Sequence, residues 1–222
     1  MIIFLLILFV ILAFLSIMLI KEMKVRVLAT VLSFAMVALS LVLLTGNAHE
    51  HWGMKVKTTT EKSQIYSAQD QNTYGVLAYQ QLGTSGKEKV FVYKNKQDAK
   101  DTTVKKPDLQ TTTKIQDIAG NQAFEQTTTK EYVYENGFYQ FLFGIAGNNH
   151  DVKSKTVIYQ VPETWIAMST ADGAKLKAAL AQKMGDAEFI SWIQQNKQMA
   201  AEDPDAAARD AVATYKNILA NS

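Results

Sequence analysis

Two long runs without a charged side chain open the sequence, and they limit what this chain can fold into. They cover residues 1–20 and 27–46, and the six residues between them hold three basic side chains and one acidic side chain. A helix of about 20 residues crosses a hydrocarbon core of about 30 Å, and a chain in hydrocarbon must satisfy its backbone hydrogen bonds internally. Residues 1–46 are therefore predicted to form a transmembrane hairpin of two antiparallel helices. The small side chains expected at their contact are Ala29, Ser33, Ala38 and Ser40.

The short loop between the runs also predicts an orientation. Basic residues in short loops stay on the cytoplasmic side, so Lys21, Lys24 and Arg26 are expected at the cytoplasmic interface. Both termini and the main domain are then expected outside the plasma membrane, with Trp52 at the outer headgroup level. Two alternatives stay open. The first run is long for a signal peptide and lacks a basic n-region, whereas small residues around Ala48 would permit cleavage there.

Composition limits the classes of partner. Without the loop, the chain totals of 23 basic and 21 acidic residues become 20 of each for residues 47–222. A neutral domain argues against nucleic acid as a partner. The chain has no cysteine, which excludes disulfides, a thiolate nucleophile, cysteine-bound zinc and a lipid-anchored cysteine. The lipid bilayer is the predicted partner, and a second envelope protein such as a transporter is a candidate lateral partner.

Residues 47–168 are predicted to form an antiparallel β domain of the sandwich type. From about residue 55 the apolar side chains recur with period two and turn residues are frequent, as is typical of such domains. The predicted strands are residues 74–82, 87–93, 109–118, 123–135 and 152–161. Residues 83–86 are a predicted turn, residues 94–107 are a predicted charged loop, and Pro162 is expected to end the last strand.

Two glycine–asparagine pairs predict hairpins with defined registers. A two-residue loop at Gly120-Asn121 would pair Thr113 with Thr128 and Thr112 with Thr129. Threonine is favoured on half-exposed strands, so these positions are expected to form a solvent-facing ladder.

Asn136-Gly137 is the stronger of the two signals, because both residues tolerate positive φ. A hairpin there would pair Tyr134 with Tyr139 and Tyr132 with Phe141. One face of the sheet would then carry Tyr132, Tyr134, Tyr139, Phe141 and Phe143. Core packing is one interpretation of this face, and an exposed ligand surface for a glycan or peptide is the other.

Residues 169–222 are predicted to be helical. Ser169 is a candidate N-cap with Asp172 as its partner, a second helix is expected over residues 187–200, and Asp203-Pro204 is typical of a helix start. The last helix has an apolar stripe that comprises Ala208, Val212, Tyr215, Ile218 and Leu219. This stripe predicts packing against the sheet, against the other helices or against a partner.

Histidines are the only candidates for a metal site. His49 and His51 would point the same way in an extended segment, and with Glu50 and His150 they form a weak candidate set for zinc or copper. The sequence has no nucleophile elbow, no metalloprotease motif and no phosphate-binding glycine loop. It predicts neither a catalytic residue nor a cofactor.

Several segments resemble a family of uncharacterised two-pass membrane proteins of lactic-acid bacteria, classed as a domain of unknown function. The matching segments are residues 51–55, 58–60, 82–84, 86–90, 143–150 and 161–165, and with the hairpin the resemblance extends over about residues 1–168. It implies a plasma-membrane protein of a Gram-positive bacterium and brings no activity.

Two functions follow from the sequence. The first is a non-catalytic interaction or accessory module of the bacterial envelope, held by the hairpin. The alternative is an envelope ligand-binding sensor or enzyme that uses the aromatic sheet face or the loop of His150.

Overall fold

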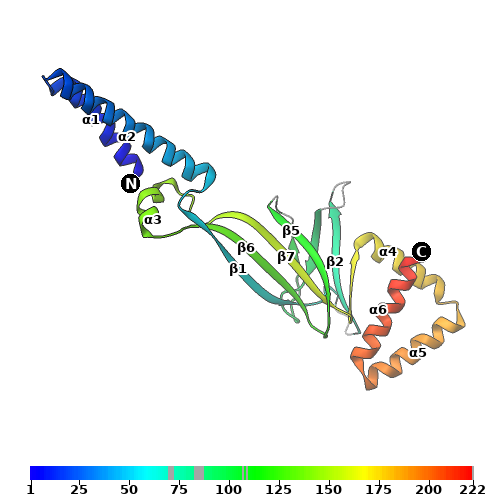
Figure 1. Ribbon diagram of the computed structural model, residues 1–222. Helices are drawn as coiled ribbons and strands as arrows, with labels where there is room; N and C mark the ends of the chain where they lie inside the picture. Colours follow the sequence, from blue (N-terminus) through cyan, green and yellow to red (C-terminus); the bar gives the residue numbers. More distant parts are fainter. Residues whose placement is uncertain (70–72, 83–87, 107, 109, 222) are drawn as a thin grey trace. The chain divides into compact units, whose positions relative to one another are not determined.

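The computed structural model describes residues 1–69, 73–82, 88–106, 108 and 110–221. Two apolar helices come first, mixed sheets follow, and three helices end the chain, which is an α+β arrangement (Figure 1). The helices are α1 (Ile2–Leu19), α2 (Met23–Glu50), α3 (Gly137–Phe143), the 3-10 turn η1 (Gly144–Ala146), α4 (Thr170–Lys183), α5 (Ala187–Glu202) and α6 (Pro204–Ala220). The strands are β1 (Met54–Ile65), β2 (Gly75–Leu82), β3 (Glu88–Tyr93), β4 (Thr103–Lys105), β5 (Thr111–Ile118), β6 (Ala123–Tyr134), β7 (Asp151–Pro162) and β8 (Trp165–Ser169).

The chain divides into two compact units. The first comprises residues 1–59 and 129–154, and the second comprises residues 60–128 and 155–222. The first unit holds α1, α2, α3 and η1, and the second holds both sheets' core residues and the three C-terminal helices. Strands β1, β6 and β7 contribute residues to both units.

The two N-terminal helices lie side by side (Figure 1). Both are long and apolar enough to cross a membrane. Ser16 and Thr30 face each other across the pair, with 3.1 Å between their hydroxyl oxygens. Ser40 is buried as predicted, whereas Ala38 is exposed, because the helical period of 3.6 residues directs it away from the row of Ser33, Val37 and Ser40.

The predicted antiparallel sheet is wrong in two places, where strands pair in parallel. The strand orders are β1-β6-β7-β5 and β4-β3-β2-β8, and the pairs β5–β7 and β2–β8 are parallel. Parallel neighbours need a long crossover connection. The chain provides such a connection in each case. Along the sequence, β6 and α3 separate β5 from β7, and most of the domain separates β2 from β8.

The predicted hairpin at Gly120-Asn121 is also wrong. Strand β7 lies between β6 and β5, so Thr112 pairs with Thr156 and Thr113 pairs with Val157. The reason is burial: Val157, Tyr159 and Val161 of β7 are all at most 4% exposed, and a strand this apolar is stable in the interior of a sheet rather than at its edge. Thr128 instead shares a hydrogen bond with Thr60, 3.2 Å between the oxygens.

The other strand predictions agree with the structure where it describes them. Strands β2 and β3 form the expected antiparallel pair, with Leu82 opposite Glu88, while the predicted turn at 83–86 lies outside the described residues. Within the predicted loop 94–107, residues Thr103–Lys105 form the short strand β4, which pairs with β3. Strand β8, which the alternation did not single out, pairs with β2.

One hydrophobic cluster of the second unit draws on both sheets. Phe91 of β3 and Tyr159 of β7 are stacked, with ring centroids 4.2 Å apart. The buried members of this cluster are Ile65, Leu77, Phe91, Tyr93, Ala123, Val157, Tyr159, Val161 and Trp165. Side chains of the two sheets therefore share one core, as period-two strands with one apolar face require.

The C-terminal helices pack on β2 and β8. Both predicted caps are confirmed: the Ser169 hydroxyl accepts a hydrogen bond from the backbone N–H of Asp172, and the Asp203 carboxylate accepts one from Ala206. A second apolar cluster joins Val76, Ile166 and Met168 of the strands to Leu176, Phe189, Val212 and Ile218 of α4, α5 and α6. The apolar stripe of the last helix is thus covered by its own chain.

A carboxylate is buried beside the shared core of the sheets. Glu125 is 5% exposed. Its carboxylate accepts hydrogen bonds from the Tyr93 hydroxyl, at 2.5 Å, and from the Lys105 ammonium. Burial favours the neutral acid, but the bonds from Lys105 and Tyr93 and the charge of Lys105 hold the pKa of the Glu125 carboxyl below its ordinary value.

This network predicts a pH-dependent contribution to stability. At neutral pH, Glu125→Gln should lower the free energy of unfolding by about 2 kcal/mol, since hydrogen bonds to charged groups contribute about 1.5–3 kcal/mol. Because the folded pKa is depressed, this contribution is present above the unfolded pKa of about 4.3 and is lost as the pH falls through the folded value. Thermal unfolding of the full chain in detergent from pH 7 to pH 3 measures it.

The matched control is Asp117→Asn, which removes an exposed carboxylate from β5 and should leave the melting temperature within error at each pH. A Glu125→Gln deficit of equal size at pH 7 and pH 3 would contradict the proposed ionic role of Glu125.

Candidate functional site

Helix α2 continues past the predicted end at residue 46, and its last turn contacts other residues of the first unit. Asn47 is fully buried, and its side-chain amide donates to the Trp52 carbonyl oxygen over 2.8 Å. His51 ends the helix in a left-handed conformation (φ 56°), and its backbone N–H and that of Trp52 both donate to the Gly46 carbonyl. A Cβ at Gly46 would lie 2.3 Å from the Trp52 ring, so glycine permits this close packing.

A buried pair of asparagines connects α2 to the loop before β7. The side-chain nitrogen of Asn148 donates to the side-chain oxygen of Asn47 over 3.0 Å and to its carbonyl over 3.3 Å. The Tyr134 hydroxyl donates to the Asn148 side-chain oxygen over 2.7 Å and lies 3.0 Å from the Phe143 carbonyl. Each buried amide is therefore satisfied by a partner far away in the sequence.

The predicted hairpin at Asn136-Gly137 is wrong, because Asn136 caps a helix instead. Its side-chain oxygen accepts hydrogen bonds from the backbone N–H groups of Phe138 and Tyr139, and α3 follows. Asparagine suits both a type I′ turn and an N-cap. The run after it also lacks the apolar–polar alternation that a second strand needs, so the helix forms.

Without that hairpin the predicted aromatic sheet face does not exist as one surface. Tyr132 and Tyr134 remain neighbours on β6, whereas Tyr139 and Phe141 lie on α3. Tyr139 packs on Gly53, where a Cβ would lie 2.4 Å from its ring, and Phe141 is 63% exposed. Phe143 is buried and stacks with Tyr139, their centroids 6.3 Å apart.

The histidines are held separately. His51 stacks on the Tyr132 ring with 3.6 Å between centroids, and the His150 ring nitrogen lies 2.9 Å from the Glu131 carboxylate. Neighbouring side chains of a strand point to opposite faces, so Glu131 and Tyr132 hold the two rings apart. His49 is exposed in the last turn of α2. Across the described ranges, no group of three or more histidine, cysteine, aspartate or glutamate side chains could hold a metal ion.

His51 and His150 have positive φ angles, of 56° and 69°. Among the described residues, they are the two non-glycine residues with a positive φ. The left-handed conformation is uncommon for non-glycine residues and persists where surrounding contacts impose it. Here the stacking on Tyr132, the His150–Glu131 contact and a 2.8 Å bond from the His150 backbone N–H to the Tyr132 carbonyl supply those contacts.

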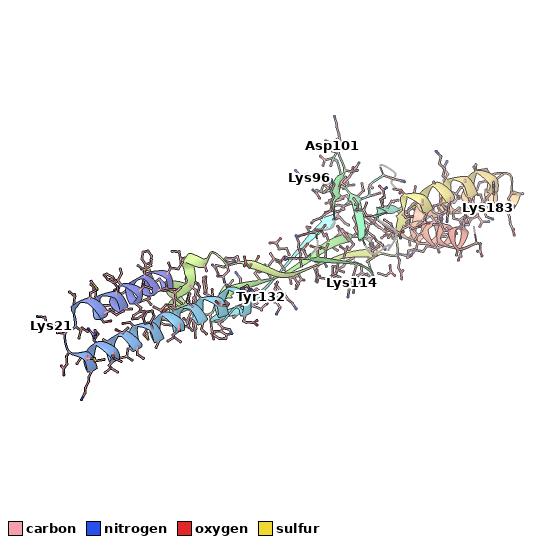
Figure 2. All side chains as sticks on the ribbon, turned by 90° about the horizontal axis from the view of Figure 1, so that it is seen from above. Lys21, Lys96, Asp101, Lys114, Tyr132 and Lys183 are labelled. Carbon is pink, nitrogen blue, oxygen red and sulfur yellow. The ribbon has the colours of Figure 1, made fainter. Side chains whose placement is uncertain are left out.

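The predicted interface residues lie at the two ends of the helix pair. Figure 2 shows Lys21 at the turn between α1 and α2 and Tyr132 beyond the other end of α2. Lys24 is exposed and Arg26 is half-buried in the first turn of α2, while Trp52 follows the last turn and is 48% exposed. The basic side chains and Trp52 are thus separated by the length of α2.

A cavity of about 360 Å³ lies in the second unit, where several strands begin or end. Its lining includes the polar side chains of Gln64, Ser67, Gln97, Asn121, Thr164 and Asp205. The Thr164 hydroxyl has no hydrogen-bond partner among the described residues. Because this oxygen lies below the solvent-accessible surface, it offers no direct contact to a ligand. The rest of the lining mixes amide, hydroxyl, charged and aromatic side chains and does not select one class of ligand.

The asparagine pair was not identified from the sequence. Asn47 stands at the end of an apolar run and Asn148 stands in a glycine-containing loop, so each has the local pattern of a surface residue. One signal was present: residues 143–150 were among the segments that resemble a known family. A resemblance identifies the segment but not the hydrogen bond, which joins residues 101 positions apart.

The first unit is therefore a pair of apolar helices whose second helix, at Asn47, is hydrogen-bonded to Asn148 in the loop before β7, and Asn148 to Tyr134 of β6; these three residues form the junction. The chain belongs to the family described as domain of unknown function DUF4811, which matches residues 22–176. The match includes α2, all the strands and the junction residues Asn47, Tyr134 and Asn148, whereas α1, α5 and α6 lie outside it. No curated protein and no solved structure matched the chain.

The junction makes a prediction about stability. Asn148→Ala should leave the buried side-chain oxygen of Asn47 without its hydrogen-bond donor and lower the free energy of unfolding by about 1–3 kcal/mol, while the Tyr134 hydroxyl keeps the Phe143 carbonyl as an acceptor. Asn149→Ala is the matched control, because its side chain is exposed, and it should have little effect. Thermal unfolding of the full chain in detergent distinguishes the two variants. Equal melting temperatures for both would contradict a structural role for the asparagine pair.

Proposed function

We propose that this protein is a two-pass plasma-membrane protein of the Gram-positive envelope that holds a sandwich-like domain outside the cell as an interaction or accessory module. The observation that carries the proposal is the surface of α1 and α2. Large apolar side chains are exposed along both helices, as lipid contact requires. They include Phe4, Ile7, Val10, Phe14, Leu28, Val31, Phe34 and Leu41.

The orientation follows from charge. Lys21, Lys24 and Arg26 lie together at the turn of the helix pair, and the positive-inside rule favours a cytoplasmic position for them. The opposite end of the pair leads into the domain through Trp52, a residue enriched at membrane interfaces. On this proposal both termini and the domain are extracytoplasmic.

The hydrogen bonds among the junction residues support an interaction role rather than a catalytic one. The side chains of Asn47, Asn148 and Tyr134 bond to one another, so their polar groups serve to join the domain to the anchor. Such an arrangement fixes a surface close to the membrane, where lateral neighbours in the same bilayer are the available partners. A transporter or another envelope protein is the class of partner that we propose.

The orientation can be tested by labelling, because the chain has no native cysteine. In intact cells, a membrane-impermeant maleimide should label Lys114→Cys, which is exposed on β5, and should label Lys24→Cys only after permeabilisation. The reverse pattern would place the domain in the cytoplasm. Labelling of both sites in intact cells would show that the helices do not cross the membrane.

The interaction role can be tested by purification in mild detergent. The full chain should elute with one membrane protein at constant stoichiometry, and that protein, when tagged, should retrieve this chain in return. The control is the hairpin, residues 1–46, fused to an unrelated exported domain, which should not retain the partner. If the full chain remains without a stoichiometric partner in several mild detergents and in nanodiscs, the accessory role is wrong.

A further inference from the structure

The short helix α3 and the turn η1 lie at the domain end of the helix pair. The backbone nitrogen of Met1 donates to the carbonyl oxygens of Phe141 and Leu142, both over 2.8 Å. Ile2, at the start of α1, is 1% exposed. Figure 1 shows α3 next to the first turn of α1. The start of α1 and the end of α2 thus lie in the same unit as this short helix.

One side of α3 is anchored in the unit. Phe143 is buried, Tyr139 packs on Gly53, and the Tyr134 hydroxyl reaches the Phe143 carbonyl. The backbone N–H of Glu135, just before α3, donates to the Gly53 carbonyl over 3.0 Å. The orientation of α3 within the first unit is therefore set by contacts on its inner side.

The other side of α3 and η1 exposes large apolar side chains. Phe138 is 66% exposed, Phe141 is 63% exposed and Ile145 is 52% exposed. Spacings of three and seven residues place them on one face of a helical segment. Residues 137–147 contain no charged side chain. Exposed apolar surface of this density on a folded protein marks an interaction surface.

We infer that this face, defined by Phe138, Phe141 and Ile145, inserts into the outer interfacial layer of the bilayer that α1 and α2 span. The inference rests on the proposed membrane position of the helices. Three observations select lipid as the occupant: the face adjoins the first turn of α1, it lacks charge, and Trp52 at the end of α2 is also exposed. Aromatic side chains are favoured at this depth, and a helix with one apolar face lies in the interface plane.

The insertion gives the first unit a third point of attachment to the membrane besides α1 and α2. With the two helices alone, residues 129–154 of this unit could pivot about the helix ends. An aromatic face held rigidly by Phe143 and Tyr139 restricts that motion, because tilting would pull Phe138 and Phe141 out of the lipid. The same contact explains why α3 forms at all with its apolar side chains outward.

Site-directed spin labelling of the full chain tests the inference. Single cysteines replace Phe138, Phe141, Gln140, Leu12 or Lys114 in the cysteine-free chain, and each nitroxide-labelled protein is reconstituted in phosphatidylglycerol–phosphatidylcholine vesicles. Accessibility to oxygen reports lipid, and accessibility to a water-soluble nickel chelate reports water. Labels at Phe138 and Phe141 should be accessible to oxygen and protected from nickel, at a depth between those of Lys114 and Leu12. The label at Gln140, the matched control on the same helix, should be accessible to nickel.

The outcomes separate the inference from the proposed function. If Leu12 lies deep in the lipid but Phe141 is as accessible to nickel as Lys114, the inference fails and the membrane hairpin stands. If Phe141 is protected from both reagents, protein rather than lipid covers the face and the inference also fails. A label at Leu12 that is accessible to nickel would overturn the membrane hairpin itself.

Discussion

The hydrogen bonds between Asn47 and Asn148 are the interaction on which the arrangement of the first unit depends. An unpaired amide in a buried position costs about 1–3 kcal/mol, so each asparagine is acceptable where it lies because the other is there. The pair joins the part of α2 beyond its apolar run to the loop that leads into β7. Tyr134 extends the same network to β6 and to the end of α3.

Close packing surrounds this pair. It is permitted by residues without a side chain and by unusual backbone conformations. Trp52 lies against Gly46 and Tyr139 lies against Gly53, where a side chain on either glycine would overlap the ring. His51 and His150 take left-handed conformations beside the same stretch of β6. The histidines that suggested metal chemistry therefore act in the structure as ends of elements, held by stacking and by a carboxylate.

Local signals predicted the elements better than they predicted the pairing of elements. The caps at Ser169 and Asp203 and the bounds of β2, β6 and β7 depend on nearby residues, and the structure agrees with them. The Gly120-Asn121 pairing failed because β7, whose Val157, Tyr159 and Val161 are buried, lies between β6 and β5. The Asn136-Gly137 hairpin failed because the same two residues also begin a helix. In the first case a distant strand took the place next to β6, and in the second the turn residues were compatible with two structures.

The sequence by itself determined the pair of apolar helices, the position of the basic turn between them and the period-two and helical segments that follow. These properties depend on hydrophobicity, charge and spacing along the chain, which can be read locally. Only the tertiary structure decided that β5 and β2 find parallel partners, that the C-terminal helices cover β2 and β8, and that α3 turns Phe138 and Phe141 outward. Those outcomes depend on which distant side chains compete for the same buried space, and that competition is settled when the whole chain packs.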